Sequence, residues 1–142
     1  GDAIFIGWEV YCLGRAGSGE TICRGKFRWR MLIERDGRPL WFENCRLDDP
    51  AALQSPVLLA GQTVVGVLTA AAQNLDSNLL GNCRALRPAT GDGAVTLLPG
   101  LLVGRYLGAS SEAAKNYFIA LWRILRPAVI GRSTVEPRIW RV

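Results

Sequence analysis

Residues 25–47 read GKFRWRMLIERDGRPLWFENCRL, and this stretch decides the fold class. From Phe27 to Ile33, apolar side chains alternate with mostly charged ones, which is the period of a half-buried strand. Asp36-Gly37 then favours a tight turn into a return strand in which Leu40 belongs to the apolar face. The sequence therefore predicts a β-hairpin.

A two-residue turn at Asp36-Gly37 also predicts the register of this hairpin. It places Met31 opposite Phe42, so that these apolar side chains share one face. It places Arg30 opposite Glu43, where the two charges form an ion pair on the other face. We therefore expect an apolar face turned to the core and a charged face turned to solvent.

Four further strands and two helices complete the expected fold. The strands are expected at 4–13, 63–69, 94–98 and 101–107, the last two joined across a Pro-Gly turn. Asp76 is a suitable N-cap for a helix over about 76–87, and Ser110 or Ser111 for a helix over about 111–126 that Pro127 ends. The sequence predicts a single domain, 1–142, that is mainly β, with stacked mixed or antiparallel sheets and two helices.

The composition excludes several classes of protein. With 142 residues, 49% of them apolar and 20% charged, the chain can bury a sizeable core and is neither disordered nor fibrous. It contains no histidine, which removes the usual general base and the commonest metal ligand, so an enzyme is not expected. Of its 17 basic residues 15 are arginine, which suits recognition of carboxylates or phosphates, although a solvated basic surface is an equal alternative.

A basic stripe along the first hairpin strand suggests nucleic-acid binding. It is formed at alternate positions by Arg24, Lys26, Arg28 and Arg30. The neighbouring aromatic residues point to the opposite face, however, so they cannot stack on bases that the stripe would hold. A basic, β-rich nucleic-acid-binding module is therefore the second hypothesis and not the first.

The cysteines and the apolar segments bear on the cellular compartment in which the protein is expected. Cys12, Cys23, Cys45 and Cys83 form no C-x-x-C pair, so we expect reduced thiols, with a disulfide or a thiolate metal site as alternatives. The longest apolar run, 57–72, is interrupted and too short to span a membrane. In the absence of a signal peptide, we expect a cytoplasmic protein that does not enter the membrane.

Two acidic sites stand out in the first half of the chain. Glu9 lies within an apolar strand, where its carboxylate must be paired or face water, and Arg15 is its nearest cation in sequence. Asp48 and Asp49 precede Pro50, which is typical of a solvated turn.

The C-terminal segment is expected to hold a partner protein. Two prolines stiffen it, and its arginines can bond the carbonyls or carboxylates of a neighbouring surface. Because aromatic and arginine side chains tend to dominate protein interfaces, the predicted partner-binding residues are Tyr117, Trp122, Arg126, Arg132, Arg138 and Trp140.

Several segments together resemble the C-terminal half of the UreD (UreH) family of urease accessory proteins. The matching stretches are Trp8 to Val10 with Leu13 to Arg15, Asp36 to Leu40, Leu102 to Gly108, Leu121 to Pro127, Gly131-Arg132, and Pro137 to Trp140. Members of that family are about twice as long. Since the chain also starts directly in a strand without a methionine, we expect it to be the C-terminal portion of a longer protein.

The resemblance implies a β-rich chaperone, not an enzyme, that helps insert nickel into apo-urease. In that scheme the protein binds apo-urease and the accessory protein UreF, and through UreF the GTPase UreG. Removal of half of such a fold would leave unpaired strand edges, so a partner, a homo-oligomer or a rearrangement is expected to cover them.

The resemblance also implies a transient route for nickel without a tightly bound cofactor. Glu9, Glu43 and Asp48, with Cys45 behind them, are the residues expected to line it, since oxygen ligands hold a borderline cation weakly enough to release it. The alternative for each carboxylate is an ordinary surface salt bridge.

Overall fold

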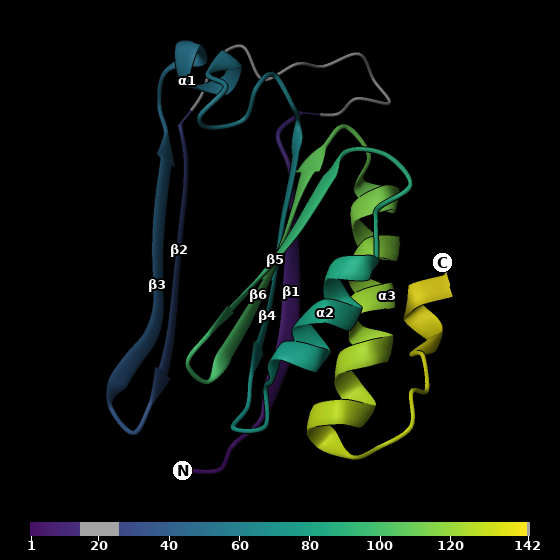
Figure 1. Ribbon diagram of the computed structural model, residues 1–142. Helices are drawn as coiled ribbons and strands as arrows, with labels where there is room; N and C mark the ends of the chain where they lie inside the picture. Colours follow the sequence, from purple (N-terminus) through teal and green to yellow (C-terminus); the bar gives the residue numbers. More distant parts are fainter. Residues whose placement is uncertain (15–25, 142) are drawn as a thin grey trace.

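The structure is a computed structural model, which describes residues 1–14 and 26–141. Arg15, Arg24 and Cys23, which the sequence analysis singled out, lie outside these residues. Figure 1 shows the arrangement of the elements. In chain order they are β1 (Phe5–Cys12), β2 (Phe27–Arg35), β3 (Arg38–Leu47), α1 (Pro50–Gln54), β4 (Val64–Ala71), α2 (Ser77–Ala85), β5 (Asp92–Leu98), β6 (Leu101–Gly108), α3 (Ser111–Ile130) and the short 3₁₀ helix η2 (Arg138–Arg141).

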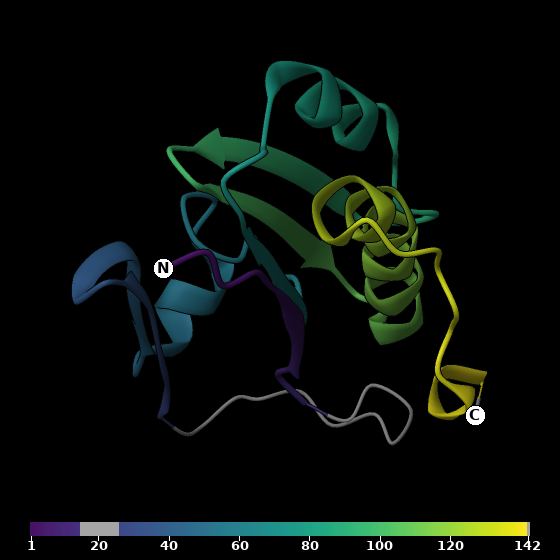
Figure 2. The ribbon, with the colours of Figure 1, turned by 90° about the horizontal axis from the view of Figure 1, so that it is seen from below.

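These elements form three layers. A four-stranded antiparallel sheet has the order β1-β4-β6-β5, and the hairpin β2-β3 is a separate two-stranded sheet. The hairpin lies over one face of the larger sheet, whereas α2 and α3 cover the other (Figures 1 and 2). The predicted fold class, mainly β with stacked sheets and two longer helices, is confirmed.

The central strand β4 is buried along its whole length because it is covered on both faces. Val65 and Val67 point to the hairpin, whereas Leu68 and Ala70 point to the helices, as the two-residue period of a strand requires. This explains why its sequence is continuously apolar where a strand with one wet face would alternate.

The expected helices form, but the second one is longer than predicted. The Asp76 carboxylate accepts a hydrogen bond from the Leu79 backbone N–H at 2.7 Å and begins α2 as expected. The Ser110 hydroxyl accepts a hydrogen bond from the Ala113 backbone N–H at 3.1 Å and begins α3.

The prediction that Pro127 ends the helix at residue 126 is wrong, because α3 continues to Ile130. The fixed φ of proline is compatible with a helix, and the final turn gains the burial of Val129 and a hydrogen bond from Asn74 Nδ2 to the Ala128 carbonyl at 2.8 Å. Gly131, in the left-handed conformation with φ 69°, provides the actual C-cap.

The hairpin forms as predicted, but most of its register differs. Beside the turn Glu34 pairs with Pro39, as a two-residue turn requires, and a β-bulge then shifts the pairing by one residue. Met31 therefore lies opposite Glu43, Leu32 opposite Phe42, and Arg30 opposite Asn44 in place of the expected Glu43. Because a shift by one residue exchanges the two faces of a strand, Glu43 points toward the larger sheet and Phe42 toward solvent.

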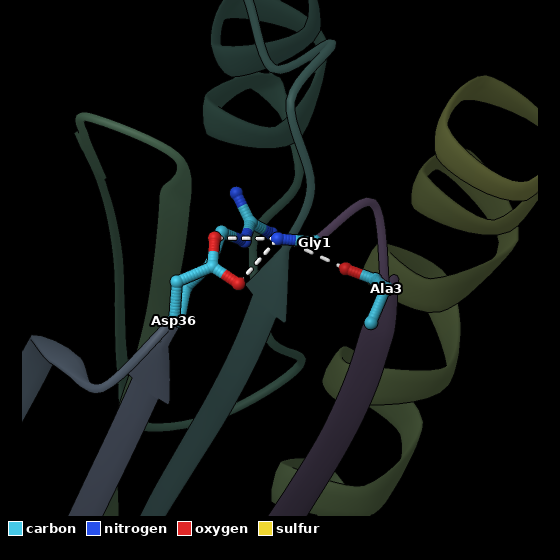
Figure 3. A network of polar contacts seen from close by, with 4 residues as sticks. Gly1, Ala3 and Asp36 are labelled. Atoms are coloured by element: carbon cyan, nitrogen blue, oxygen red, sulfur yellow. Dashed lines mark hydrogen bonds and ion pairs between the residues drawn. The ribbon is translucent and has the colours of Figure 1, made fainter.

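The start of the chain is bound to the hairpin turn. Figure 3 shows the Gly1 ammonium group beside the Asp36 carboxylate, with which it forms an ion pair. This contact lowers the pKa of Asp36 through the hydrogen bond and the charge of the ammonium group. Arg35 donates a hydrogen bond to the Ala3 carbonyl at 3.3 Å. The hydrogen bond from Arg35 holds the hairpin turn near the start of β1.

Of the helices within residues 26–141, none combines the length and the apolar character that crossing a membrane requires.

Candidate functional site

A polar pair lies between the hairpin and the four-stranded sheet. Arg105 Nη2 of β6 donates a hydrogen bond to Glu43 Oε1 of β3 at 2.9 Å, and the guanidinium group lies 5.6 Å from the centre of the Trp41 ring. The Glu43 side chain is 15% exposed and that of Arg105 is 42% exposed. The pair thus separates two apolar clusters of the inter-sheet core, one around Trp29 and the other around Val103.

A cavity of about 340 Å³ opens beside this pair. Trp29, Glu43, Cys45 and Arg105 are among its lining residues. Glu43 Oε2 and the Trp29 indole N–H are buried, and neither has a hydrogen-bond partner among the described residues. Both atoms are closed off from solvent, so the cavity itself presents the Cys45 side chain and the edge of the Glu43–Arg105 ion pair among mainly apolar residues.

The charge of Glu43 acts on two neighbouring side chains, the Cys45 thiol and the Tyr11 hydroxyl. Burial raises the pKa of the Cys45 thiol, and the negative charge of Glu43 raises it further, whereas Arg105 acts in the opposite direction. Burial also raises the pKa of Tyr11 to about 12, assisted by the hydrogen bond that its hydroxyl donates to Glu9 and by the charges of Glu9 and Glu43. These side chains come from β1, β3 and β6.

Two of the four expected nickel-route residues, Glu43 and Cys45, share the inner face of β3 and line this cavity. Glu9 lies on β1, where it is exposed and accepts a hydrogen bond from Tyr11, and it does not line the cavity. Asp48 lies beyond the end of β3 and forms an ion pair with Arg46. Within residues 1–14 and 26–141, no three acidic, cysteine or histidine side chains are close enough to chelate a metal ion. A role of these residues in nickel transfer stays a prediction.

The C-terminal segment folds back onto its own chain. The Trp140 ring lies between Trp8 of β1 and Trp122 of α3, with both pairs of ring centres 4.9 Å apart. Arg123 Nε donates a hydrogen bond to Glu136 Oε1 at 2.7 Å. We call this arrangement, formed by Trp8, Trp122, Arg123, Glu136 and Trp140, the tail clasp.

The predicted partner-binding residues occupy different environments. Tyr117 is 3% exposed and lies in the core, and Trp122, which is part of the tail clasp, is 6% exposed. Arg126 lies over the Trp122 ring and donates to the Ser133 carbonyl. Arg132 and Arg138 are exposed, together with the apolar Val135 and Ile139.

Contact of any of these residues with a partner stays a prediction. Sequence reasoning missed Trp8 and Glu136, which have no distinguishing sequence signal. It also missed Arg105, which is signalled by a lone charge within an apolar strand.

The outward surface of the hairpin carries the basic stripe. Lys26, Arg28 and Arg30 are exposed, as expected. Arg28 lies directly opposite Arg46, and Leu32 directly opposite Phe42. We call the surface formed by Arg28, Arg30, Leu32, Phe42 and Arg46 the outer hairpin face.

Comparison with known proteins assigns the chain to a family. The family model described as "UreD urease accessory protein" matches residues 1–141. The chain belongs to the UreD family. The resemblance inferred from the sequence is thereby confirmed.

Curated relatives named "Urease accessory protein UreD" are similar over almost the whole chain. The protein of Azoarcus sp. (strain BH72) is 50% identical over 141 residues, which cover 99% of this chain and 50% of the relative. Those of Dechloromonas aromatica and Nitrosococcus oceani are 46% and 45% identical, covering 98% of the chain in each case and 50% and 47% of the relatives. The chain thus spans about half the length of these relatives, whose names describe accessory proteins and not enzymes.

Proposed function

We propose that this chain is part of a scaffold that helps insert nickel into apo-urease in the cytoplasm. The observation that carries this proposal is the match of the UreD family model to residues 1–141, together with relatives named as urease accessory proteins. The described structure supplies a rigid three-layered platform, which suits a protein that holds others in place.

The scaffold bridges apo-urease to UreF, and through UreF to UreG. The exposed part of the C-terminal segment supports this proposal because Arg132, Arg138 and Ile139 are presented on a segment that the tail clasp fixes in place. A fixed surface loses less conformational entropy when it binds a partner than a freely moving segment does. Arginine and exposed apolar side chains are suitable anchors for such a contact.

Nickel is the cargo of this scaffold and is held only in passing. Glu43 lies between the two sheets with Cys45 beside it on β3, and the exposed carboxylate of Glu9 on β1 is the proposed neighbouring station. Arg105 competes with a cation for Glu43, since its guanidinium group already neutralises that carboxylate. Binding of a divalent ion beside a fixed positive charge is weakened, which favours release over storage.

Co-purification of the full-length protein tests the scaffold. We expect it to form a stable complex with apo-urease and UreF, and with UreG only when UreF is present. Failure to bind either apo-urease or UreF contradicts the proposal. In the same complex, Arg138→Glu is expected to weaken binding relative to Arg87→Glu, an equal charge reversal at an exposed residue just beyond the C-terminal end of α2.

A further inference from the structure

We propose that the outer hairpin face docks an acidic protein surface that presents an apolar side chain to Leu32 and Phe42. This inference rests on the proposed function, since it assigns one of the scaffold's contacts to a surface that lies on the hairpin. The hairpin layer is separated from the tail clasp by the whole four-stranded sheet (Figures 1 and 2). The two surfaces can therefore hold different partners at the same time.

The first argument is the charge of the face. Arg28 and Arg46 are directly opposite each other on neighbouring strands, an arrangement that destabilises an isolated sheet. Arg30 adds a third cation at the next outward position of β2. Asp48 binds Arg46, and Glu34 is exposed at the outward position of β2 after Leu32, but Arg28, Arg30 and the neighbouring Lys26 still leave an excess of positive charge among the described residues. An acidic partner surface would relieve the repulsion between Arg28 and Arg46.

The second argument is the apolar pair at the centre of the face. Leu32 is 46% exposed and Phe42 is 54% exposed, and they lie directly opposite each other. The Arg30 guanidinium group lies 5.2 Å from the centre of the Phe42 ring. Apolar side chains in the middle, with arginine around them, are typical of the composition of a protein interface. A phosphate backbone would gain nothing from the Leu32 side chain, so an acidic protein fits the face better than a nucleic acid.

The third argument is the preformed shape of the face. The inner side of the hairpin is fixed by buried side chains such as Trp29 and Leu47, and Arg35 beside its turn donates a hydrogen bond to the Ala3 carbonyl at 3.3 Å. The positions of the outward side chains are therefore set before a partner arrives. Preorganisation of this kind lowers the entropic cost of binding.

Charge reversals in the full-length protein test the proposal against apo-urease and UreF. Arg28→Glu and Arg30→Glu are each compared with Arg87→Glu, which changes the net charge equally but lies on the far side of the sheet, just beyond the C-terminal end of α2. At low ionic strength we expect each hairpin variant to weaken binding of one of the two proteins by about tenfold. The wild-type affinity should fall with added salt, and the fall should be smaller in the hairpin variants. Arg87→Glu should remain within about twofold of the wild type.

A second pair of variants tests the apolar centre. Leu32→Ser with Phe42→Ser should weaken the same complex at every salt concentration, since apolar burial is not screened by ions. Thermal unfolding of each variant shows whether the fold is retained. Hydrogen exchange in the complex should show protection of residues 28–32 and 42–46.

A defined probe separates failure of this inference from failure of the proposed function. The probe is a synthetic peptide of alternating glutamate and leucine, compared with polyglutamate and with duplex DNA. The wild type should bind the alternating peptide most tightly, and Arg28→Glu should abolish that binding. If apo-urease and UreF do not bind but the peptide does, the proposed function fails while the docking surface stands. If the hairpin variants bind like the wild type, or if DNA binds more tightly than the peptide through Arg28, the docking surface is wrong.

Discussion

Replacement of Glu43 by Gln is expected to destabilise the protein by about 1 kcal/mol. A hydrogen bond between charged groups contributes about 1.5–3 kcal/mol. Because 42% of the Arg105 side chain is exposed, solvent screens the pair and reduces this contribution toward that of a surface ion pair. For a domain of this size, a loss of about 1 kcal/mol lowers the unfolding midpoint by roughly 2–4 °C.

A double-mutant cycle measures this interaction directly. Urea unfolding of Glu43→Gln, Arg105→Gln and the double variant should give a coupling free energy of about 1 kcal/mol. The pKa of Cys45, measured from the pH dependence of its alkylation, should fall in Glu43→Gln and rise in Arg105→Gln, since the two charges act on the thiol in opposite directions. A general loosening of the fold would instead shift the pKa of Cys45 in the same direction in both variants. A coupling below about 0.3 kcal/mol, or equal shifts of the Cys45 pKa, would refute the reasoning.

Three further predictions concern the core and the tail. Trp140→Ala removes two aromatic contacts and should lower the free energy of unfolding by about 2 kcal/mol in urea titrations. An unchanged free energy of unfolding would mean that the tail clasp does not form in solution. Gly66→Ala places a Cβ 2.5 Å from Cε2 of the fully buried Phe118 ring and should lower the free energy of unfolding by about 1–3 kcal/mol. Adding Phe118→Leu should restore part of this stability. Additive losses in the double variant would contradict this packing. Burial raises the pKa of Cys83 from 9.0 to about 11, so its contribution to stability is complete below pH 9, and the free energy of unfolding should fall as the pH rises toward 11. Mass spectrometry of the protein alkylated at pH 8 should find Cys12 modified and Cys83 protected. Modification of Cys83 at the same rate as Cys12 would show that Cys83 is not buried.

The sequence was sufficient to predict the strands of the hairpin but not their register. Alternation from Phe27 to Ile33 and the Asp36-Gly37 turn were sufficient to predict its two strands. The phase of β3 could not be predicted, because residues 40–42 are a continuous apolar run that permits either face to be buried. The β-bulge resolves this ambiguity by packing Leu40 and Trp41 together against the larger sheet, a choice that depends on the shape of that sheet.

The end of α3 was mispredicted for a similar reason. Pro127 is a local signal to stop, and it was given more weight than the left-handed Gly131 four residues later. The burial of Val129 and the contact of Asn74 with the last turn are tertiary interactions. They outweigh the free-energy cost of a proline in the helix, but no local sequence pattern predicts them.

The candidate site was predicted only in part. Glu9, Glu43 and Cys45 were expected to lie together on the strength of a family resemblance; Glu43 and Cys45 line one cavity, whereas Glu9 lies exposed on β1 outside it. Asp48 was included as a further carboxylate of the route that the resemblance implies, but it lies beyond the end of β3 and pairs with Arg46. Arg105 follows 62 residues after Glu43, and pairing over such a separation can be seen only once the order of the strands is known.

The nickel content of urease tests the central claim most directly. Urease is produced with its other accessory proteins, with and without the full-length form of this protein, and the metal bound per active site is measured after purification. The account predicts nearly complete nickel occupancy with the protein present and apo-urease without it. Equal nickel occupancy in both preparations would contradict the account.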